Sequence, residues 1–212
     1  MPSTGFSWKN LVFFKRLAYR IRDIIIALLG LIGLSWLLLL IAILLRFTQK
    51  RVIFRQVRTG FREQPFTLIK FSTLRDILPG EREEDDQRKR LTVAGRILRQ
   101  LSLDELPQLW HVLTGKMSLV GPRPLLHEYL PLYSEAQKRR FLVRPGITGW
   151  AQINGRNCIR FSERFELDQW YVAHQRFGLD LKIMWLTAIG FFRKNDVYAD
   201  SATTSEKFDG TN

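Results

Sequence analysis

The longest apolar run in the chain covers residues 24–45, which are 22 consecutive residues without a charge. A helix of this length is long enough to cross the hydrocarbon core of a bilayer. The run is too long for the apolar part of a cleavable signal peptide, and no small-residue cleavage pattern follows it. The pattern therefore predicts a membrane helix at residues 23–46.

Two short β-prone segments come next along the chain. Residues 52–54 and 66–71 are rich in β-branched and aromatic residues, and Gly60 and Pro65 stand between them, which predicts two strands. Apolar residues elsewhere recur mostly at helical spacing. The fold class that we expect is therefore α/β, mostly helical with a small β-element. The helices expected after the strands cover residues 92–101, 102–113, 125–144 and 165–174.

Two adjacent carboxylates, Asp104 and Glu105, lie at the start of the amphipathic helix expected at residues 102–113. Ser102 with Glu105 three residues later matches a capping box. We expect the open N–H groups at this helix end to favour the ionised form of Asp104. The spacing alone leaves open whether the pair does more than cap the helix. The apolar face of this helix consists of Leu106, Leu109, Trp110 and Leu113.

Four arginines surround the carboxylate pair in the sequence. Arg99 precedes it, and Arg123 follows within the GPRP segment, where a proline on each side restricts the backbone. Arg144 and Arg156 lie beside Pro-Gly and Asn-Gly turns. Guanidinium groups bind phosphate by paired hydrogen bonds. A carboxylate beside phosphate needs either a cation between them or a covalent reaction, so the pattern indicates chemistry on a phosphate-bearing ligand.

The positive charge is concentrated around the apolar run. The formal net charge is +13, and residues 1–58 carry ten bases and one acid, which is +9 of that total. Bases flank the run on both sides, and the positive-inside rule then places both flanks in the cytoplasm. A helix that enters the membrane and turns back satisfies this rule, and Gly30, Gly33 and Ser35 would ease the bend. A single membrane pass is the alternative.

Residues 1–22 mix aromatic and basic side chains, as in a helix that lies in the headgroup region of an anionic membrane. A disordered basic tail is the alternative. Residues 181–192 are too short to span a membrane, and their aromatics and terminal bases favour contact with the bilayer over a purely internal position. The domains that we expect are residues 1–22, 23–46, 47–195 for a compact catalytic part, and 196–212 for a polar tail.

Composition narrows the function further. The one cysteine, Cys158, excludes an internal disulfide, and the three histidines lack metal-ligand spacing. The basic pI of about 10.4 raises the possibility of nucleic-acid binding, but such proteins usually carry their charge on the folded body, so we expect no nucleic-acid partner. A further hypothesis is a membrane scaffold that binds anionic lipid. This hypothesis gives no role to the arginines in the Pro- and Gly-containing turns.

Four motifs taken together resemble the bacterial sugar transferase family. They are LSLDELPQ at residues 101–108, GPRP at 121–124, RPGITG at 144–149 and QINGR at 152–156. Members of this family are monotopic polyprenyl-phosphate phosphoglycosyl transferases. The similarity covers the chain from about residue 15. The chain resembles the minimal members, which have only the catalytic core, and is similar to the enzyme that initiates bacterial N-linked glycan assembly.

The resemblance implies a membrane position as well as an activity. It implies a re-entrant membrane helix, interfacial amphipathic helices and a compact catalytic domain on the cytoplasmic face of the bacterial inner membrane. Family members break the re-entrant helix at a Ser-Pro pair, whereas this chain has Ser35-Trp36. After Lys70 the family usually has a further base and a methionine, whereas this chain has Ser72 and Leu74, so only Lys70 carries over.

The resemblance also implies a two-step reaction in glycoconjugate or polysaccharide biosynthesis. Asp104 attacks a UDP-sugar, UMP leaves, and undecaprenyl or another polyprenyl phosphate takes the sugar 1-phosphate from Asp104. Mg²⁺ is the implied cofactor, with Asp104 as its protein ligand, and Glu105 assists catalysis. The implied partners are the UDP-sugar, the polyprenyl phosphate and anionic lipid of the cytoplasmic leaflet. The implied substrate-binding residues are Lys70, Arg99, Arg123, Arg144 and Arg156.

Overall fold

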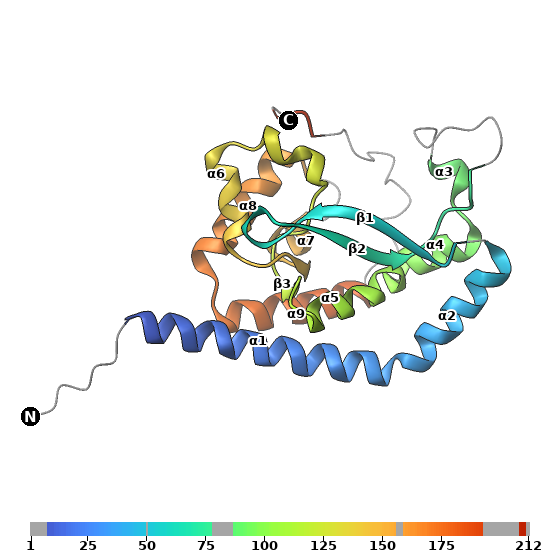
Figure 1. Ribbon diagram of the computed structural model, residues 1–212, viewed down its shortest axis with the longest axis horizontal. Helices are drawn as coiled ribbons and strands as arrows, with labels where there is room; N and C mark the ends of the chain where they lie inside the picture. Colours follow the sequence, from blue (N-terminus) through green and yellow to red (C-terminus); the bar gives the residue numbers. More distant parts are fainter. Residues whose placement is uncertain (1–7, 50, 78–86, 156–158, 193–207, 211–212) are drawn as a thin grey trace, which may run out of the picture.

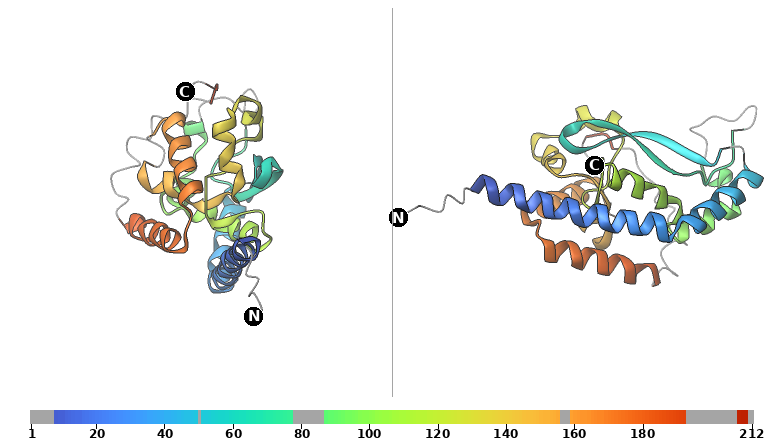
Figure 2. Two further views of the ribbon diagram at one scale, coloured as in Figure 1. Left: turned by 90° about the vertical axis from the view of Figure 1, so that its left-hand side faces the viewer. Right: turned by 60° about the horizontal axis from the view of Figure 1, so that its bottom comes forward.

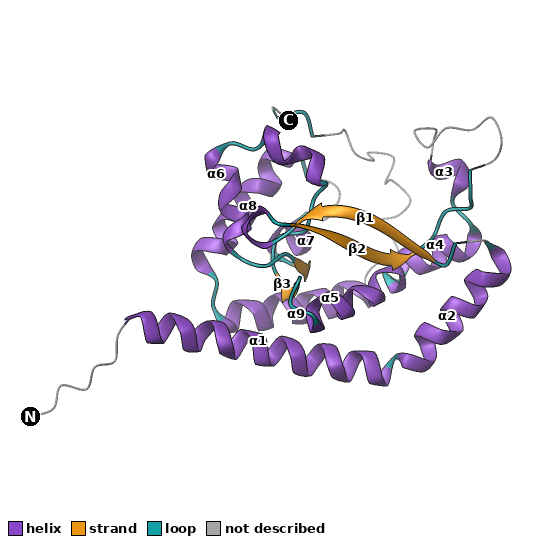
Figure 3. Ribbon diagram, in the orientation of Figure 1, coloured by secondary structure: helices purple, strands orange, loops and turns teal. Residues whose placement is uncertain are grey.

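The computed structural model describes residues 8–49, 51–77, 87–155, 159–192 and 208–210. Figures 1 and 3 show a mostly helical fold with a long two-stranded hairpin and a second, smaller sheet, which confirms the predicted fold class at this level. The elements are α1 (Trp8–Gly33), α2 (Ser35–Thr48), β1 (Ile53–Thr59), η1 (Phe61–Glu63), β2 (Pro65–Phe71), α3 (Gln87–Arg90), α4 (Val93–Gln100), η2 (Leu103–Gln108), α5 (Leu109–Leu113), β3 (Ser118–Val120), η3 (His127–Leu132), α6 (Glu135–Lys138), η4 (Arg139–Leu142), β4 (Gly146–Thr148), α7 (Trp150–Asn154), α8 (Phe161–His174) and α9 (Phe177–Phe192).

Helices α1 and α2 form one bent apolar pair along an edge of the molecule (Figure 1). Within the described residues no single helix is long and apolar enough to cross a membrane, whereas Arg16–Gly33 and Ser35–Thr48 together reach that length and composition. The pair is bent by 58°. The Ser35 hydroxyl donates a hydrogen bond to the Ile32 carbonyl at 2.7 Å, which satisfies a backbone acceptor beside the break. The bend therefore forms where the sequence predicted it, without a proline.

Helix α1 is continuous across the expected boundary between residues 22 and 23, and it packs against α5. The Arg20 guanidinium donates to the carbonyl groups of Val112 and Leu113 at the C-terminal end of α5. A Cβ atom on Gly30 would lie 3.1 Å from the Leu109 side chain, so the two helices approach closely there. Arg20, which was expected to face lipid headgroups, therefore binds the C-terminal end of α5 instead.

A buried polar cluster fastens α1 to the rest of the fold. Arg22 forms ion pairs with Asp23 at 2.8 Å and with Asp180 of α9 at 2.7 Å. The Ser118 hydroxyl donates to the other oxygen of Asp23 at 2.6 Å, and the Tyr171 hydroxyl donates to the other oxygen of Asp180 at 2.8 Å. All five side chains are buried. We call these five residues the α1 clamp.

The hydrophobic core lies where α1, the strands and α9 meet. Figure 2 shows α9 running beside α1 on the same side of the molecule. The side chains of α9 divide between two environments, because Ile183 is fully buried whereas Trp185 is 66% exposed. Only one face of this helix lies in the core, and its exposed face is also apolar, with Leu181, Trp185 and Leu186. The buried core residues are Ala27, Phe66, Leu68, Val112, Met117, Leu119, Val120, Tyr171, Leu179 and Ile183.

The β-hairpin confirms the two predicted strands. Strands β1 and β2 are antiparallel, and the register places Phe54 opposite Lys70 and Arg58 opposite Phe66. The strand pair β3–β4 is parallel and short, with Ser118 opposite Gly146. This second pair brings the segment that follows β3, which contains Arg123, next to β4.

Two expected helices are broken in the structure. The helix predicted at residues 102–113 consists of a 3₁₀ segment, η2, followed by the short helix α5, because Pro107 lacks the N–H that a regular helix would use. Residues 125–144 form the three short elements η3, α6 and η4, and Pro131 lies within η3. The burial expected for Trp110 is also wrong, since its side chain is 54% exposed.

Candidate active site

The carboxylate pair lies on η2, which packs against strand β2. Asp104 is 5% exposed, and Glu105 is partly buried. The predicted capping box is wrong: Ser102 has the left-handed φ of 52°, and its side chain does not cap η2. The Glu105 N–H donates instead to the Ser102 carbonyl at 3.3 Å, which closes a tight turn. The turn thus places the two carboxylates beside strand β2.

The electrostatic setting of Asp104 differs from the expected one. Burial raises the pKa of Asp104, and the neighbouring Glu105 raises it further. Lys70, Arg99 and Arg123 lower this pKa but do not cancel the rise. The expectation that a helix N-terminus favours the ionised form is therefore wrong, because η2 is a short 3₁₀ turn and desolvation dominates. Three of the five cations that the sequence analysis named, Lys70, Arg99 and Arg123, nevertheless act on this carboxylate.

Lys70 reaches the site from strand β2. Its ammonium lies 5.3 Å from the ring centroid of Phe54, the residue opposite it in the hairpin. Burial lowers the pKa of Lys70, and Asp104 opposes that shift. The lysine is therefore a desolvated cation whose strongest favourable electrostatic interaction is with the Asp104 carboxylate. Such a group is suited to hold a phosphate oxygen beside Asp104.

Arg99 reaches the site from α4, which lies close to the chain after β2. The side chain of Thr92 caps α4 by accepting the Gly95 N–H at 2.9 Å. A Cβ atom on Gly95 would lie 2.0 Å from the Thr73 carbonyl oxygen, so a larger residue would push the helix away. The Arg99 Nε donates to the Thr73 hydroxyl at 2.8 Å. Thr73 therefore fixes one side of the guanidinium.

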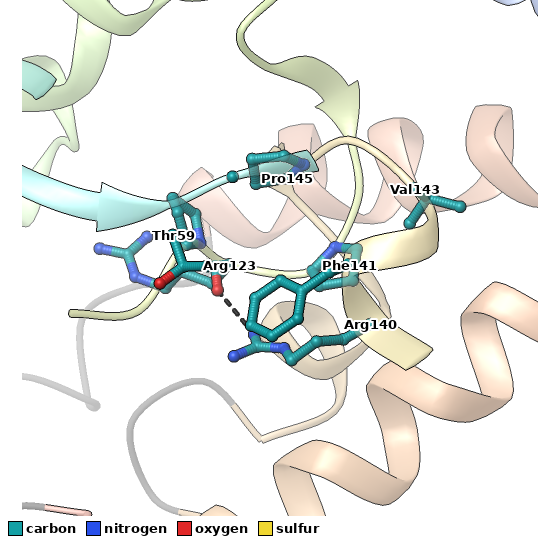
Figure 4. A pocket seen from close by; sticks show the side chains of 9 residues that line it. Thr59, Arg123, Arg140, Phe141, Val143 and Pro145 are labelled. Atoms are coloured by element: carbon teal, nitrogen blue, oxygen red, sulfur yellow. Dashed lines mark hydrogen bonds between the residues drawn. The ribbon is translucent and has the colours of Figure 1, made fainter. Parts of the chain in front are cut away.

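Arg123 pairs directly with the second carboxylate. Its Nη2 lies 2.6 Å from the Glu105 Oε1. The loop that carries Arg123 is attached to β4, because the Gly121 N–H donates to the Thr148 carbonyl at 2.9 Å. The pocket in Figure 4 lies against this loop, and its dashed line marks the hydrogen bond from Arg140 to the Arg123 carbonyl.

The other two predicted arginines do not add to this group. Arg144 donates from Nε to the Gly115 carbonyl at 2.9 Å, and its guanidinium lies 5.5 Å from the Phe61 ring centroid. It is not among the charges that shift the pKa of Asp104. Arg156 lies outside the described residues. Their role in substrate binding stays a prediction. We call Lys70, Arg99, Asp104, Glu105 and Arg123 the carboxylate site.

The described residues contain no group of three or more His, Cys, Asp or Glu side chains that could hold a metal ion by itself. Mg²⁺ often binds through only one or two carboxylates and completes its shell with water and substrate phosphates. Asp104 and Glu105 provide adjacent carboxylates, and Glu105 raises the pKa of Asp104. A cation would relieve that repulsion, so the residues present fit a magnesium ion that arrives with a diphosphate.

Sequence reasoning missed two residues behind the site, Arg140 and Asp168. They form a buried ion pair at 2.8 Å. A signal was present in the sequence: Asp168 lies three residues from Phe165 and three from Tyr171, so the apolar face of α8 includes a carboxylate. A buried carboxylate requires a partner. The pattern predicts neither which cation supplies the partner nor what that cation contacts.

The arrangement favours transfer of a phosphorylated group. The carboxylate site has one buried, partly desolvated acid that is faced by three cations, which come from β2, α4 and the loop after β3. Cations placed in this way attract a di-anionic phosphate and stabilise the charge that develops during its transfer. Asp104 is the more deeply buried of the two carboxylates whose chemistry allows them to accept a phosphoryl centre covalently.

Comparison with known proteins agrees with this chemistry. A family model described as "Bacterial sugar transferase" matches residues 14–194. The chain is 52% identical over 160 residues to the "Uncharacterized sugar transferase EpsL" of Bacillus subtilis, with 76% of this chain and 79% of that protein covered. It is 40% identical over 185 residues to the "Exopolysaccharide production protein ExoY" of Sinorhizobium fredii, covering 78% and 81%. The "UDP-glucose:undecaprenyl-phosphate glucose-1-phosphate transferase" of Klebsiella pneumoniae is 40% identical over 189 residues, which are 83% of this chain and 40% of that protein.

Proposed function

The chain belongs to the bacterial sugar transferase family, and we propose that it transfers a sugar 1-phosphate from a UDP-sugar to a membrane polyprenyl phosphate, with release of UMP. The observation that carries this proposal is the convergence of Lys70, Arg99 and Arg123 on the buried carboxylate of Asp104. The name of the Klebsiella relative, which specifies UDP-glucose and undecaprenyl phosphate, supports the substrate classes.

In the first step, a carboxylate oxygen of Asp104 attacks the β-phosphorus of the UDP-sugar. A bond forms between that oxygen and phosphorus, and the bond from phosphorus to the oxygen that bridges to the α-phosphate breaks. UMP leaves with that oxygen and its electron pair. Lys70, Arg99 and Arg123 neutralise the phosphate oxygens, so that the anionic nucleophile and the anionic donor can meet.

In the second step, a phosphate oxygen of the polyprenyl phosphate attacks the same phosphorus. The acyl-phosphate bond to Asp104 breaks, the carboxylate is restored, and a polyprenyl diphosphate sugar forms. A covalent intermediate separates one difficult transfer into two easier ones. It also means that the soluble donor and the lipid acceptor need not occupy the site together. Because the bond between the sugar and its oxygen is never cut, the anomeric configuration is retained.

Asp104 and the diphosphate would hold Mg²⁺, with Glu105 as the neighbouring carboxylate. When bound, the ion would neutralise charge on the diphosphate and orient it toward the nucleophile. Glu105 already directs Arg123 through the 2.6 Å ion pair. Glu105 thus has a role in shaping the site whether or not it touches the ion.

We place the bent pair α1–α2 in the cytoplasmic leaflet as a re-entrant membrane helix. Apolar side chains around its bend are exposed, since Leu29, Ile32, Trp36 and Leu39 are 62–65% exposed, and Phe47 at the other end of α2 is 85% exposed. An apolar surface of this size is typical of membrane contact. The α1 clamp then holds the catalytic part at the bilayer surface, where the lipid acceptor is found.

A substrate panel tests the proposed function. Full-length protein in nanodiscs is supplied with undecaprenyl phosphate, Mg²⁺ and, in turn, UDP-glucose, UDP-galactose, UDP-GlcNAc and an amino-deoxy UDP-sugar. We expect UMP release with at least one donor, dependent on the lipid for multiple turnovers. Absence of UMP from all donors, with intact binding of the protein to anionic vesicles, would favour the lipid-binding scaffold instead.

Cysteine labelling tests the membrane position. In a Cys158→Ser background, single cysteines replace Asn10 and Arg55, which lie on either side of the apolar stretch formed by Arg16–Gly33 and Ser35–Thr48. A membrane-impermeant thiol reagent should label both positions only from the cytoplasmic side. Labelling from opposite sides would show that the pair spans the bilayer.

A further inference from the structure

Arg140 is a buried cation that belongs to neither the carboxylate site nor the α1 clamp. Its side chain is 2% exposed, and its Nη2 pairs at 2.8 Å with Asp168, which is 1% exposed. A buried ion pair is often no more stable than apolar residues of similar volume, because both ions lose their hydration. Stability alone therefore does not explain the pair.

The remaining donors of Arg140 point to a second role. The Nη2 atom also donates to the backbone carbonyl of Arg123 at 2.7 Å, and Nη1 donates to the Tyr133 hydroxyl at 3.2 Å. Figure 4 shows the guanidinium directed at that carbonyl from below the loop. The rings of Tyr133, Phe141 and Phe165 surround the guanidinium with centroids 5.3–5.8 Å away. The cation is therefore locked in one orientation.

The loop that Arg140 contacts is the one that presents Arg123 to the site. Backbone hydrogen bonds attach its start to β4, through Gly121 N–H to the Thr148 carbonyl and Gly146 N–H to the Pro122 carbonyl. The hydrogen bond from Arg140 continues this attachment to the next peptide group. On its other side, Arg123 reaches Glu105 at 2.6 Å. The position of the Arg123 guanidinium thus depends on a backbone that Arg140 helps to fix.

We infer that Arg140 is a positioning residue for Arg123, and that Asp168 holds Arg140 in place. The inference rests on the proposed function only in taking Arg123 as a ligand of the donor diphosphate. Arg140 itself does not touch the substrate. Without it, the Arg123 loop samples other positions, and the diphosphate loses a cation that is aligned before it binds.

Three sets of variants isolate this role. Arg140→Met with Asp168→Leu replaces the ion pair by apolar residues and avoids leaving one charge buried alone. Arg140→Lys keeps a cation for Asp168 but is too short to serve both Asp168 and the Arg123 carbonyl. Tyr133→Phe is the matched control, because it removes a hydrogen-bond partner of Arg140 and leaves the contact with Arg123 intact.

The first readout is independent of any reaction. Hydrogen exchange by mass spectrometry reports on the backbone amides of residues 118–126 in the full chain. We expect faster exchange in this segment for Arg140→Lys and for the apolar pair, and wild-type exchange for Tyr133→Phe. Wild-type exchange in both Arg140 variants would overturn the inference, even if the chain proved to have no transferase activity.

The second readout is a double-mutant cycle on UMP release. Misplacement of a substrate-positioning group lowers turnover by up to about 100-fold, and we expect a loss toward this size in the Arg140 variants. In an Arg123→Ala background, the same Arg140 changes should lower turnover by no more than about twofold, because their effect passes through Arg123. An undiminished loss in that background would overturn the inference. This result differs from the one expected if the proposed function is wrong, because the wild type would then release no UMP.

Discussion

The carboxylate site and the α1 clamp both bury carboxylates beside cations, yet they satisfy them differently. In the clamp, Asp23 receives hydrogen bonds from Arg22 and Ser118, and Asp180 receives them from Arg22 and Tyr171. Within the described part of the chain, no hydrogen bond to the Asp104 carboxylate is formed, although three cations act on it. A carboxylate with hydrogen bonds to both oxygens holds helices and strands together. A carboxylate that lies beside cations without such hydrogen bonds is available to react.

The largest expected effect comes from neutralising the reactive carboxylate. Asp104→Asn keeps the shape of the side chain but removes the nucleophile, so UMP release should fall by about 1,000-fold or more. The melting temperature at pH 7 should not fall, because the raised pKa of Asp104 means that its ionised form opposes folding at that pH.

Turnover assays and thermal unfolding of the same Asp104→Asn preparation check both parts of this prediction. Turnover near the wild-type rate would remove Asp104 from its role. A large drop in melting temperature would show instead that Asp104 is structural, like the carboxylates of the clamp.

The clamp should show the opposite behaviour. Arg22→Met leaves Asp23 and Asp180 buried without their shared partner, which should lower the free energy of unfolding by about 3–5 kcal/mol. Turnover per folded molecule should change little, because the clamp is separate from the carboxylate site. Thermal unfolding in nanodiscs, with UMP release normalised to the folded fraction, measures both quantities. Unchanged stability would show that the clamp does not hold α1.

A smaller change within the clamp sharpens the comparison. Tyr171→Phe removes the hydroxyl that donates to Asp180 and leaves a buried acceptor without that bond. The expected cost is about 1–3 kcal/mol of unfolding free energy, with turnover retained. Ser118→Ala removes the corresponding donor to Asp23 and serves as the matched variant. A loss of turnover greater than the loss of folded protein in either variant would contradict a purely structural clamp.

The smallest expected effect is a shift in pH dependence. Lys70 lowers the pKa of Asp104, so Lys70→Met should raise that pKa. Because only the ionised carboxylate attacks, the acid limb of the kcat/KM profile should move to higher pH in the variant, in addition to any loss of rate. A limb that stays in place or moves to lower pH would show that Lys70 does not act on the nucleophile.

Local patterns in the sequence predicted much of the fold. The apolar run, its bend beside Ser35 and the hairpin strands all follow from composition and periodicity, and the structure confirms them. The helix at residues 102–113 was mispredicted because its apolar spacing is helical, whereas Pro107 and the left-handed Ser102 give a 3₁₀ turn. Periodicity does not report such a change in helix type.

The sequence predicted the residues that form the carboxylate site, but it did not predict the pKa of Asp104. The motifs and the family resemblance named five cations, and three of them, Lys70, Arg99 and Arg123, act on Asp104. The raised pKa of Asp104 could not be predicted, since it depends on how deeply η2 sets the side chain against β2. The contacts of Arg140 and of the α1 clamp could not be predicted for the same reason. They join residues that are far apart in the chain, so the partners depend on how the chain packs.

Covalent labelling tests the central claim most directly. Wild-type protein and the Asp104→Asn variant are mixed with a UDP-sugar that carries radioactive phosphorus at the β-position, without polyprenyl phosphate, and are then denatured. We predict that the wild type retains label in an amount equal to the UMP released, that polyprenyl phosphate removes this label, and that the variant retains none. Turnover by the wild type without retained label, or equal labelling of the variant, would contradict a phosphosugar on Asp104.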